Sequence, residues 1–328
     1  MKAITYNLYT DEFLEEIVDL PKITNQDILV KVQAVGLNPV DSKINLWKGM
    51  ISDMAPGYIT GLDVSGEVVE IGCDVKGINI GEKVLFHGNM FRKNGGFAEY
   101  CVQNFKMVIK HPNVAPEMAA ALPCAGWTAY RALTDKLKIS KGDSLFIAGG
   151  SGGVGSFAIQ IAKHLGAYPI IVTCSLKNKE YVMSLGADYA VDYNSEDILA
   201  RIVEITQGKK VMKALDCVGG TNGALCANSL AYEGEMVELV DMIDTGKYQN
   251  AFLKGIGVHH LSLGSGHQFG ERGAAKLVKA GTECTQLLEK NIIRIESLKV
   301  ISLSEVPNAL YEIRNQRTVG KIVAKLYS

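Results

Sequence analysis

The chain has 328 residues, 47% of them hydrophobic and 21% charged, with a formal net charge of −1. These are ordinary globular values, and the length predicts two domains instead of a single core. A near-neutral chain has no general attraction for polyanions, which argues against nucleic acid and anionic membranes as partners. No apolar run reaches the roughly 18 residues that a membrane span needs.

Two further features bear on where the protein resides. The N-terminal stretch "MKAITYNLYTDEFLEEIVDL" places acids where a signal peptide needs an apolar segment. The seven cysteines are scattered and include no Cys-x-x-Cys pair. Such a set predicts reduced thiols, and we therefore expect a cytoplasmic protein.

The first third of the chain has the pattern of short strands separated by glycine turns. Apolar and polar residues alternate from Ile28 to Ala34, which is typical of a half-buried strand. Similar runs follow in "DVSGEVVEIG", "EKVLFHG", "FAEYCVQ" and "MVIKHP". Consecutive short strands of this kind predict a small β-rich barrel or sandwich, not a parallel sheet.

From Pro116, which is well placed to begin a helix, the pattern changes to alternating strands and helices. The predicted strands are Leu145–Ala148, Ile170–Thr173, Tyr189–Val191, Ala214–Cys217 and Met236–Val240. The predicted helices cover roughly Gly153–Leu165, Lys179–Leu185, Ser195–Thr206 and Asn222–Leu230. Repeated βα units predict a doubly wound parallel sheet. After about residue 264 we expect a helix near Gly273–Lys290, then a strand, a helix and a final strand.

A glycine motif lies between the first strand of this alternation and the helix that follows it. Gly150, Gly152 and Gly155 form G-x-G-x-x-G, a pattern that permits a sharp turn and a close approach of the backbone to a pyrophosphate. The helix N-terminus then offers free N–H groups to the phosphates. The predicted dinucleotide-binding loop comprises Gly150, Ser151, Gly152, Gly153, Val154 and Gly155. The alternative is an ordinary turn between a strand and a helix.

The residues about 20 positions further on indicate which dinucleotide is bound. An acid there would hold the ribose 2′-hydroxyl of NAD, but the chain has Thr173–Ser175 and no acid before Glu180. Lys177 and Lys179 lie close by, and cations and hydroxyls suit a 2′-phosphate. The pattern therefore favours NADPH, the alternative being that the lysines are solvated surface at a helix start.

Several stretches in order along the chain resemble the medium-chain dehydrogenase/reductase superfamily and its zinc-independent quinone oxidoreductase branch. They are "GLNPVDSKI" (36–44), "GLDVSGEVVEIG" (61–72), "ALPCAGWTAYRAL" (121–133), "AGGSGGVGSFAIQIAKHLGA" (148–167) and "GADYAVDY" (186–193). The resemblance covers essentially the whole chain. It implies an α/β fold with a Rossmann doubly wound parallel sheet (123–263) plus a GroES-like β-rich catalytic domain (1–122), which a return segment (264–328) completes.

The same resemblance implies that no metal is bound. Zinc members of the superfamily carry Cys-x-x-Asp-x-His where this chain has Asn38, Asp41 and Lys43, and Gly-His-Glu where it has Gly61, Leu62 and Asp63. Only Cys124 matches a catalytic zinc ligand, and one ligand does not suffice for the usual three. The segment 86–97, where the structural zinc lobe should fall, has no cysteine.

The cofactor contacts of the branch carry over to particular residues. Implied at the adenosine phosphate are Lys179, Tyr193 and Arg317, next to Ser175, which is a candidate by its position beyond the glycine loop. Implied at the nicotinamide half are Thr128, Val218, Gly219, Leu263 and Gly264. For Tyr193 the alternative is that it only caps a strand end, and for Arg317 that it is a solvated helix charge.

Without a metal the acceptor must already be electrophilic, which favours a quinone or an α,β-unsaturated carbonyl reduced by hydride from NADPH. The candidate catalytic residues are Asn38 as an amide donor, Lys43 as a cation or proton donor, Asp41 as an orienting group and Tyr58 as a second donor. As alternatives, Lys43 is surface and Asn38 only holds the turn before Pro39.

Two other functions stay open. One is an NADPH-binding structural or regulatory protein with little turnover, and the other is a reductase of enoyl thioesters. In each case the expected partner is a small molecule, with no nucleic acid and no membrane. The resemblance also implies a homodimer that forms through residues 257–265.

Overall fold

The structure, a computed structural model, describes residues 1–47, 49–51, 54–315 and 318–326. The chain forms two compact units. The first contains Met1–Trp127, Leu263–Lys290 and Ile295–Ser328, and the second contains Thr128–Ser262 and Asn291–Arg294. The domain boundaries that the sequence predicts, after residues 122 and 263, stay a prediction. Within the described ranges, no helix has the length and apolar content needed to cross a membrane.

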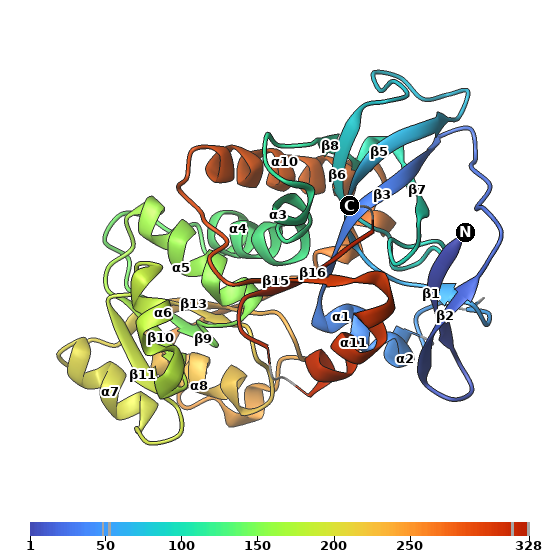
Figure 1. The fold of residues 1–328 in the computed structure, drawn as a ribbon. Coiled ribbons are helices and arrows are strands. Elements are labelled where there is room, and N and C mark those ends of the chain that lie inside the picture. Colours follow the sequence, from blue (N-terminus) through green and yellow to red (C-terminus); the bar gives the residue numbers. More distant parts are fainter. Residues whose placement is uncertain (48, 52–53, 316–317, 327–328) are drawn as a thin grey trace. The chain divides into compact units, whose positions relative to one another are not determined.

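The second unit is built on a six-stranded parallel sheet with the strand order β11-β10-β9-β12-β13-β14 (Figure 1). Its strands are β9 (Leu145–Ala148), β10 (Ile170–Cys174), β11 (Tyr189–Asp192), β12 (Val211–Asp216), β13 (Leu230–Glu238) and β14 (Gly257–His260). From the centre of the sheet, β9, β10 and β11 follow one another toward one edge, and β12, β13 and β14 follow one another toward the other edge. The direction of the strand order therefore reverses between β9 and β12. This reversal confirms the predicted doubly wound topology.

Helices connect these strands. They are α5 (Gly153–Leu165), α6 (Lys179–Ser184), α7 (Ile198–Ile205), α8 (Thr221–Ser229) and α9 (Ala251–Lys254), and a further helix, α4 (Thr128–Arg131), precedes β9. Right-handed crossovers place α5 and α6 on one face of the sheet and α7 and α8 on the other. Helix α5 coincides with the predicted range, and it ends at Gly166, which has a φ of 84° and returns its N–H to Ala162 O. Its apolar face is buried against β9 and β10.

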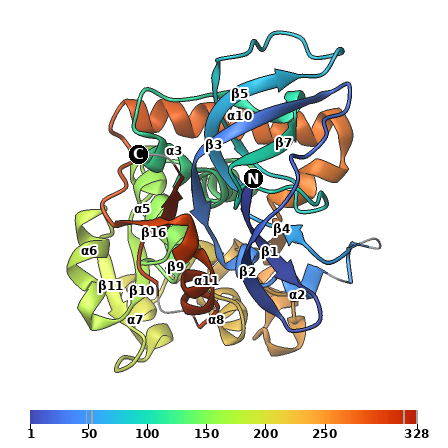
Figure 2. The same ribbon diagram turned by 45° about the vertical axis from the view of Figure 1, so that its right-hand side comes forward.

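The first unit is β-rich, as the short alternating runs predict. A three-stranded sheet of order β2-β1-β4 accompanies a seven-stranded sheet of order β15-β16-β3-β5-β6-β8, in which β7 also pairs with β3 (Figure 2). The strands are β1 (Lys2–Asn7), β2 (Glu12–Ile17), β3 (Asp27–Leu37), β4 (Tyr58–Ile59), β5 (Asp63–Ile71), β6 (Lys83–His87), β7 (Tyr100–Asn104), β8 (Ile109–Lys110), β15 (Leu298–Ser302) and β16 (Lys321–Lys325).

The C-terminal segment completes this unit. Strand β16 pairs antiparallel with β3, with Ile322 opposite Leu37, so a strand from the C-terminal segment lies beside one from the N-terminal segment in the same sheet. The helices of the unit are α1 (Pro39–Ser42), α2 (Ile44–Trp47), α3 (Pro116–Ala120), α10 (Gly270–Glu289) and α11 (Val306–Arg314). Two π-helical turns, Pro123–Trp127 and Ala132–Lys136, flank the passage into the second unit.

Candidate active site

The glycine loop follows β9 and leads directly into α5. A Cβ at Gly155 would lie 2.2 Å from Gly149 O, and one at Gly150 would lie 2.8 Å from Val172 Cβ. Both distances are shorter than side-chain contacts allow, so these two glycines are required by packing within the chain. Gly149 itself has a φ of 84°, the left-handed region that favours glycine.

Gly152 differs from its neighbours in the loop. A Cβ there would meet only Gly149 O, at an ordinary 3.6 Å, and its φ of −77° suits any residue. The chain itself therefore does not need glycine at this position. Gly152 is the N-cap of α5, whose first N–H groups have no partner within the helix and lie in a partly exposed turn. The absence of a side chain leaves them open to an anion.

A second loop lies against the first at the point where the strand order reverses. Asp216, at the end of β12, accepts hydrogen bonds from the N–H groups of Val218 (2.8 Å) and Gly219 (3.0 Å). Val218 Cγ2 lies only 2.6 Å from the position that a Cβ at Gly149 would take. The structure thus brings the predicted residues Val218 and Gly219 to the glycine loop, at the switch point where ligands of such sheets bind.

The residues expected at the adenosine phosphate follow β10 and β11. Ser175 is partly exposed at the end of β10, Lys177 and Lys179 are exposed on the next turn, and Tyr193 is 56% exposed after β11. Neither lysine forms an ion pair or side-chain hydrogen bond with another described residue. Asn178 Nδ2 donates to Ser151 Oγ over 3.2 Å, which joins this turn to the glycine loop.

Two acids, Asp192 and Glu196, stand close to these groups, and Glu196 Oε1 accepts a hydrogen bond from Asp192 N over 2.8 Å. Asp192, at the end of β11, lies opposite Cys174 in the sheet. Its carboxylate accepts from Asn194 N (3.1 Å) and Ser195 Oγ (2.9 Å), so it is used by its own turn. These hydrogen bonds hold the pKa of Asp192 below its usual range.

The remaining cofactor candidates are distributed between the units. Thr128 is the first residue of the second unit and is buried, with 8% of its surface exposed. Leu263 and Gly264 belong to the first unit, where a Cβ at Gly264 would lie 3.6 Å from His87 Cε1. Arg317 lies outside the described residues.

The first unit contains two of the catalytic candidates in one buried cluster. Asn38 is the N-cap of α1, with an extended backbone that Pro39 favours. Asp41 Oδ2 accepts from Asn38 N (3.0 Å) and Asn38 Nδ2 (3.4 Å), and Asp41 Oδ1 accepts from Gly61 N (3.1 Å). Asp41 thus holds the Asn38 side chain and the Gly61 N–H, and its role as an orienting group in catalysis stays a prediction.

Two residues that were not assigned a role from the sequence complete this cluster. Asp63 Oδ2 accepts from Asn38 Nδ2 (2.9 Å), and its Oδ1 accepts from Cys124 N (2.8 Å). The Lys321 ammonium donates to Leu37 O (3.2 Å) and to Asn38 Oδ1, and it lies 3.6 Å from Asp63 Oδ2. Both donors of the Asn38 amide are thus directed at carboxylates of the chain.

The electrostatics of the cluster follow from its burial. Asp41 and Asp63 are fully buried. Burial, and then the charge of Asp63, raises the pKa of Asp41 to about 7. Burial raises the pKa of Asp63 to about 6, against the opposing effect of the Lys321 charge. One ammonium therefore faces two carboxyl groups, of which Asp41 binds a proton near neutral pH.

Lys43 and Tyr58 stand apart from this cluster. Lys43 follows α1, is partly exposed, and its ammonium has no hydrogen bond or ion pair with a residue in the described ranges. Tyr58 is buried in β4, and its hydroxyl donates to Met90 O over 2.6 Å. The hydroxyl hydrogen of Tyr58, which the sequence predicts to be donated to a substrate, is therefore already donated to a backbone carbonyl of the same unit.

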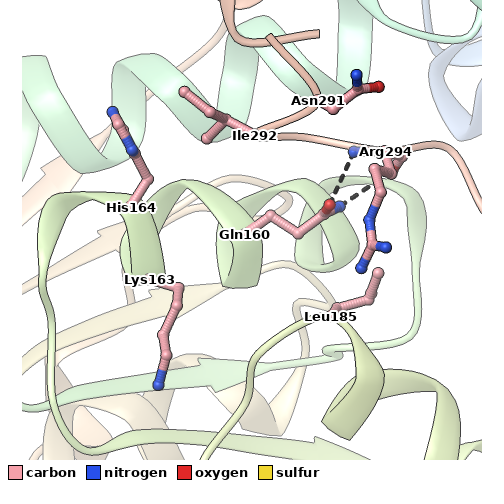
Figure 3. A pocket seen from close by; sticks show the side chains of 7 residues that line it. All are labelled: Gln160, Lys163, His164, Leu185, Asn291, Ile292 and Arg294. Atoms are coloured by element: carbon pink, nitrogen blue, oxygen red, sulfur yellow. Dashed lines mark hydrogen bonds between the residues drawn. The ribbon is translucent and has the colours of Figure 1, made fainter.

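A pocket of about 260 Å³ in the second unit lies toward the C-terminal end of α5 (Figure 3). Gln160 bridges it: Arg294 N donates to Gln160 Oε1 (2.8 Å), and Gln160 Nε2 donates to Arg294 O (3.1 Å). The pair fastens Asn291–Arg294 to α5. Because this end of α5 lies opposite the glycine loop, the pocket is not part of the predicted cofactor site.

Comparison with known proteins agrees with this geometry. Residues 24–113 match the family "alcohol dehydrogenase GroES-like domain", and residues 153–269 match "zinc-binding dehydrogenase". The chain is 36% identical over 251 residues to an Arabidopsis thaliana chloroplast envelope quinone oxidoreductase homolog, covering 73% of this chain and 74% of the relative. It is 38% identical over 211 residues to the A. thaliana chloroplastic NADPH-dependent alkenal/one oxidoreductase, covering 60% and 54%. The solved structure of the Coxiella burnetii quinone oxidoreductase superposes with a TM-score of 0.86 at 29% identity, covering 100% of this chain and 99% of the other.

The parallel sheet with its glycine loop and the GroES-like unit define a two-unit α/β protein of the dehydrogenase type. The chain belongs to the medium-chain dehydrogenase/reductase superfamily, in its quinone oxidoreductase-like branch.

The family name implies zinc, and the residues at the corresponding place do not fit it. Asp63, His87 and Cys124 bring potential ligand atoms within 4.8 Å of one another, a group that sequence spacing does not reveal. Both oxygens of Asp63, however, already accept hydrogen bonds, and the Lys321 ammonium adds a positive charge beside it. While Lys321 keeps its charge, a divalent cation on Asp63 would lie beside a buried ammonium, so the three residues do not form the ligand set that a catalytic zinc needs.

Proposed function

We propose that this protein is a reductase that transfers hydride from NADPH to a quinone or an α,β-unsaturated carbonyl. The observation that carries the proposal is the open turn at Gly152, beside a segment with two lysines that form no ion pair with another residue in the described ranges. The first supplies N–H groups for a pyrophosphate, and the second supplies cations for a further phosphate. The alkenal/one oxidoreductase relative, whose name states NADPH dependence, supports the same cofactor and acceptor class.

NADPH is favoured over NADH by charge. A 2′-phosphate next to Ser175 would meet Lys177 and Lys179, neither of which has a carboxylate partner among the described residues. Asp192, at the end of β11, has its oxygens directed to Asn194 and Ser195. These oxygens are therefore engaged by their own turn, whereas the carboxylate of an NAD site is directed at the ribose 2′-hydroxyl.

The acceptor class follows from the chemistry available in the first unit. Without a metal to polarise a simple ketone, the acceptor needs a conjugated system into which the hydride charge can spread. The oxygen that gains this charge still needs a donor. We assign this role to Lys43, because its ammonium has no partner among the residues that the structure describes, whereas the Asn38 amide and the Tyr58 hydroxyl each donate within the unit. Asn38 and Asp41 are positioning residues.

The test measures oxidation of NADPH and NADH with a panel of quinones, enones and enals. We expect turnover with NADPH, and we expect K179A to raise the KM for NADPH about tenfold while leaving that for NADH nearly unchanged. K209A, which removes another exposed lysine of the same unit, is the matched control. Equal effects of K179A on both cofactors would refute the phosphate role.

The alternatives predict different results in the same assay. Tight NADPH binding with no acceptor consumed would favour a structural or regulatory role. Turnover restricted to enoyl thioesters would favour the third function. A homodimer and a cytoplasmic location stay predictions, to be checked by light scattering and by fractionation.

A further inference from the structure

Three side chains of the kind that bind metals meet in the first unit, although they come from separate segments. Asp63 begins β5 and His87 ends β6, and the two are direct cross-strand partners. Cys124 lies in the π-helical turn, and the residue as a whole is partly exposed. His87 is buried, and its Nδ1 has no hydrogen-bond partner among the described residues. The set resembles a zinc site in its ligand types.

Lys321 determines the charge of this group. Its side chain is 4% exposed, and it has three oxygen neighbours: Leu37 O at 3.2 Å, Asn38 Oδ1 and Asp63 Oδ2 at 3.6 Å. An ammonium has three N–H donors, so all three can be used here. A buried ammonium is tolerated only when it is paired and hydrogen-bonded, which this arrangement provides.

A divalent cation on Asp63 would be close to this ammonium. A zinc–oxygen bond is about 2 Å long, and Asp63 Oδ2 lies 3.6 Å from Lys321 Nζ, so the two cations would be less than about 6 Å apart. Both are inside a buried region where charges are poorly screened. The metal would also have to displace the hydrogen bond from Asn38 Nδ2 to Asp63 Oδ2.

We propose that Lys321 is the resident cation of this cluster, and that it keeps divalent metal ions off Asp63, His87 and Cys124 while holding the Asn38 amide in place. The fold retains a latent metal site that this one lysine closes. Loss of its charge opens the site, because Asp63 then needs another cation and the ligands at His87 and Cys124 are already nearby. The inference concerns metal binding and does not depend on which acceptor is reduced.

The test compares the wild-type protein with K321M, K321Q and K321R. Each is treated with EDTA, dialysed against Zn²⁺ and freed of unbound metal, and the zinc per chain is measured by elemental analysis. K321Q keeps a donor for Leu37 O and Asn38 Oδ1 and therefore provides an uncharged variant with little change in packing. K321R keeps the charge. The double variant K321M/H87A removes one of the proposed ligands.

We expect less than about 0.1 zinc per chain in the wild type and K321R, and about one in K321M or K321Q, with a Zn²⁺-dependent rise in Tm. K321M/H87A should return to the wild-type level. Stoichiometric zinc in the wild type, a folded K321Q that retains none, or zinc in K321M that H87A does not reduce would each overturn the proposal. Absence of turnover with quinones and enones would refute the proposed function, but it would not change the zinc content expected for each variant.

Discussion

A pair of glycine substitutions separates what the cofactor requires from what the fold requires. At Gly152, alanine meets only an ordinary 3.6 Å contact. Its lower N-cap preference costs at most about 1 kcal/mol, and the reduced freedom of the unfolded chain offsets about half of that or more. At Gly155, the Cβ of alanine would lie 2.2 Å from Gly149 O, and the backbone must move until this distance is at least about 3.0 Å. Overpacking of this kind costs about 1–3 kcal/mol.

The two variants should therefore behave differently in two assays. We expect G152A to keep its Tm within about 2 °C of the wild type and G155A to lose several degrees. A methyl group at residue 152 should displace the pyrophosphate from the start of α5, so that about one charge-assisted hydrogen bond between the pyrophosphate and the helix N–H groups is lost. A fluorescence titration with NADPH measures the effect on the Kd. That loss corresponds to a Kd about 10- to 100-fold higher. An unchanged Kd for G152A would show that the dinucleotide does not lie against this turn.

Two further predictions concern buried polar groups. Folding raises the pKa of Asp41 from 3.8 to about 7, so the folded protein binds a proton at Asp41 more tightly than the unfolded chain does. The stabilisation that this proton gives is present below pH 4 and is lost as the pH rises to about 7. D41N should therefore gain stability relative to the wild type over this range, by up to about 4 kcal/mol in urea unfolding, and a pH-independent difference would contradict this. Q160A should lower the free energy of unfolding by about 1–3 kcal/mol, because it removes the two hydrogen bonds that join α5 to the Arg294 backbone. K163A, beside it on α5, should cost less than about 1 kcal/mol, and equal effects of the two variants would count against the Gln160 bridge.

Much of the fold follows from local patterns. The helix Gly153–Leu165 and the strand Leu145–Ala148 have the bounds that the sequence predicts, because apolar periodicity and flanking glycines act over a few neighbouring residues. The other strand and helix bounds of the second unit differ by a few residues, as in β13, where Leu230–Glu238 begins earlier than the predicted Met236–Val240. There the pairing of Val211 with Leu230 extends the strand, and no local signal marks it.

The electrostatics of the candidate site depend on tertiary structure alone. In the sequence, Lys321 reads as an ordinary lysine at the start of a strand, and Asn38 reads as a free amide donor. Antiparallel pairing of β16 with β3, with Ile322 opposite Leu37, brings the lysine to the asparagine and to Asp63, and cross-strand pairing of β5 with β6 adds His87. The sequence by itself determined the βα alternation, the glycine loop and the family. Only the register of strands far apart in the chain decided which polar groups are buried together, because burial and pairing, not residue type, set their charge and their hydrogen bonds.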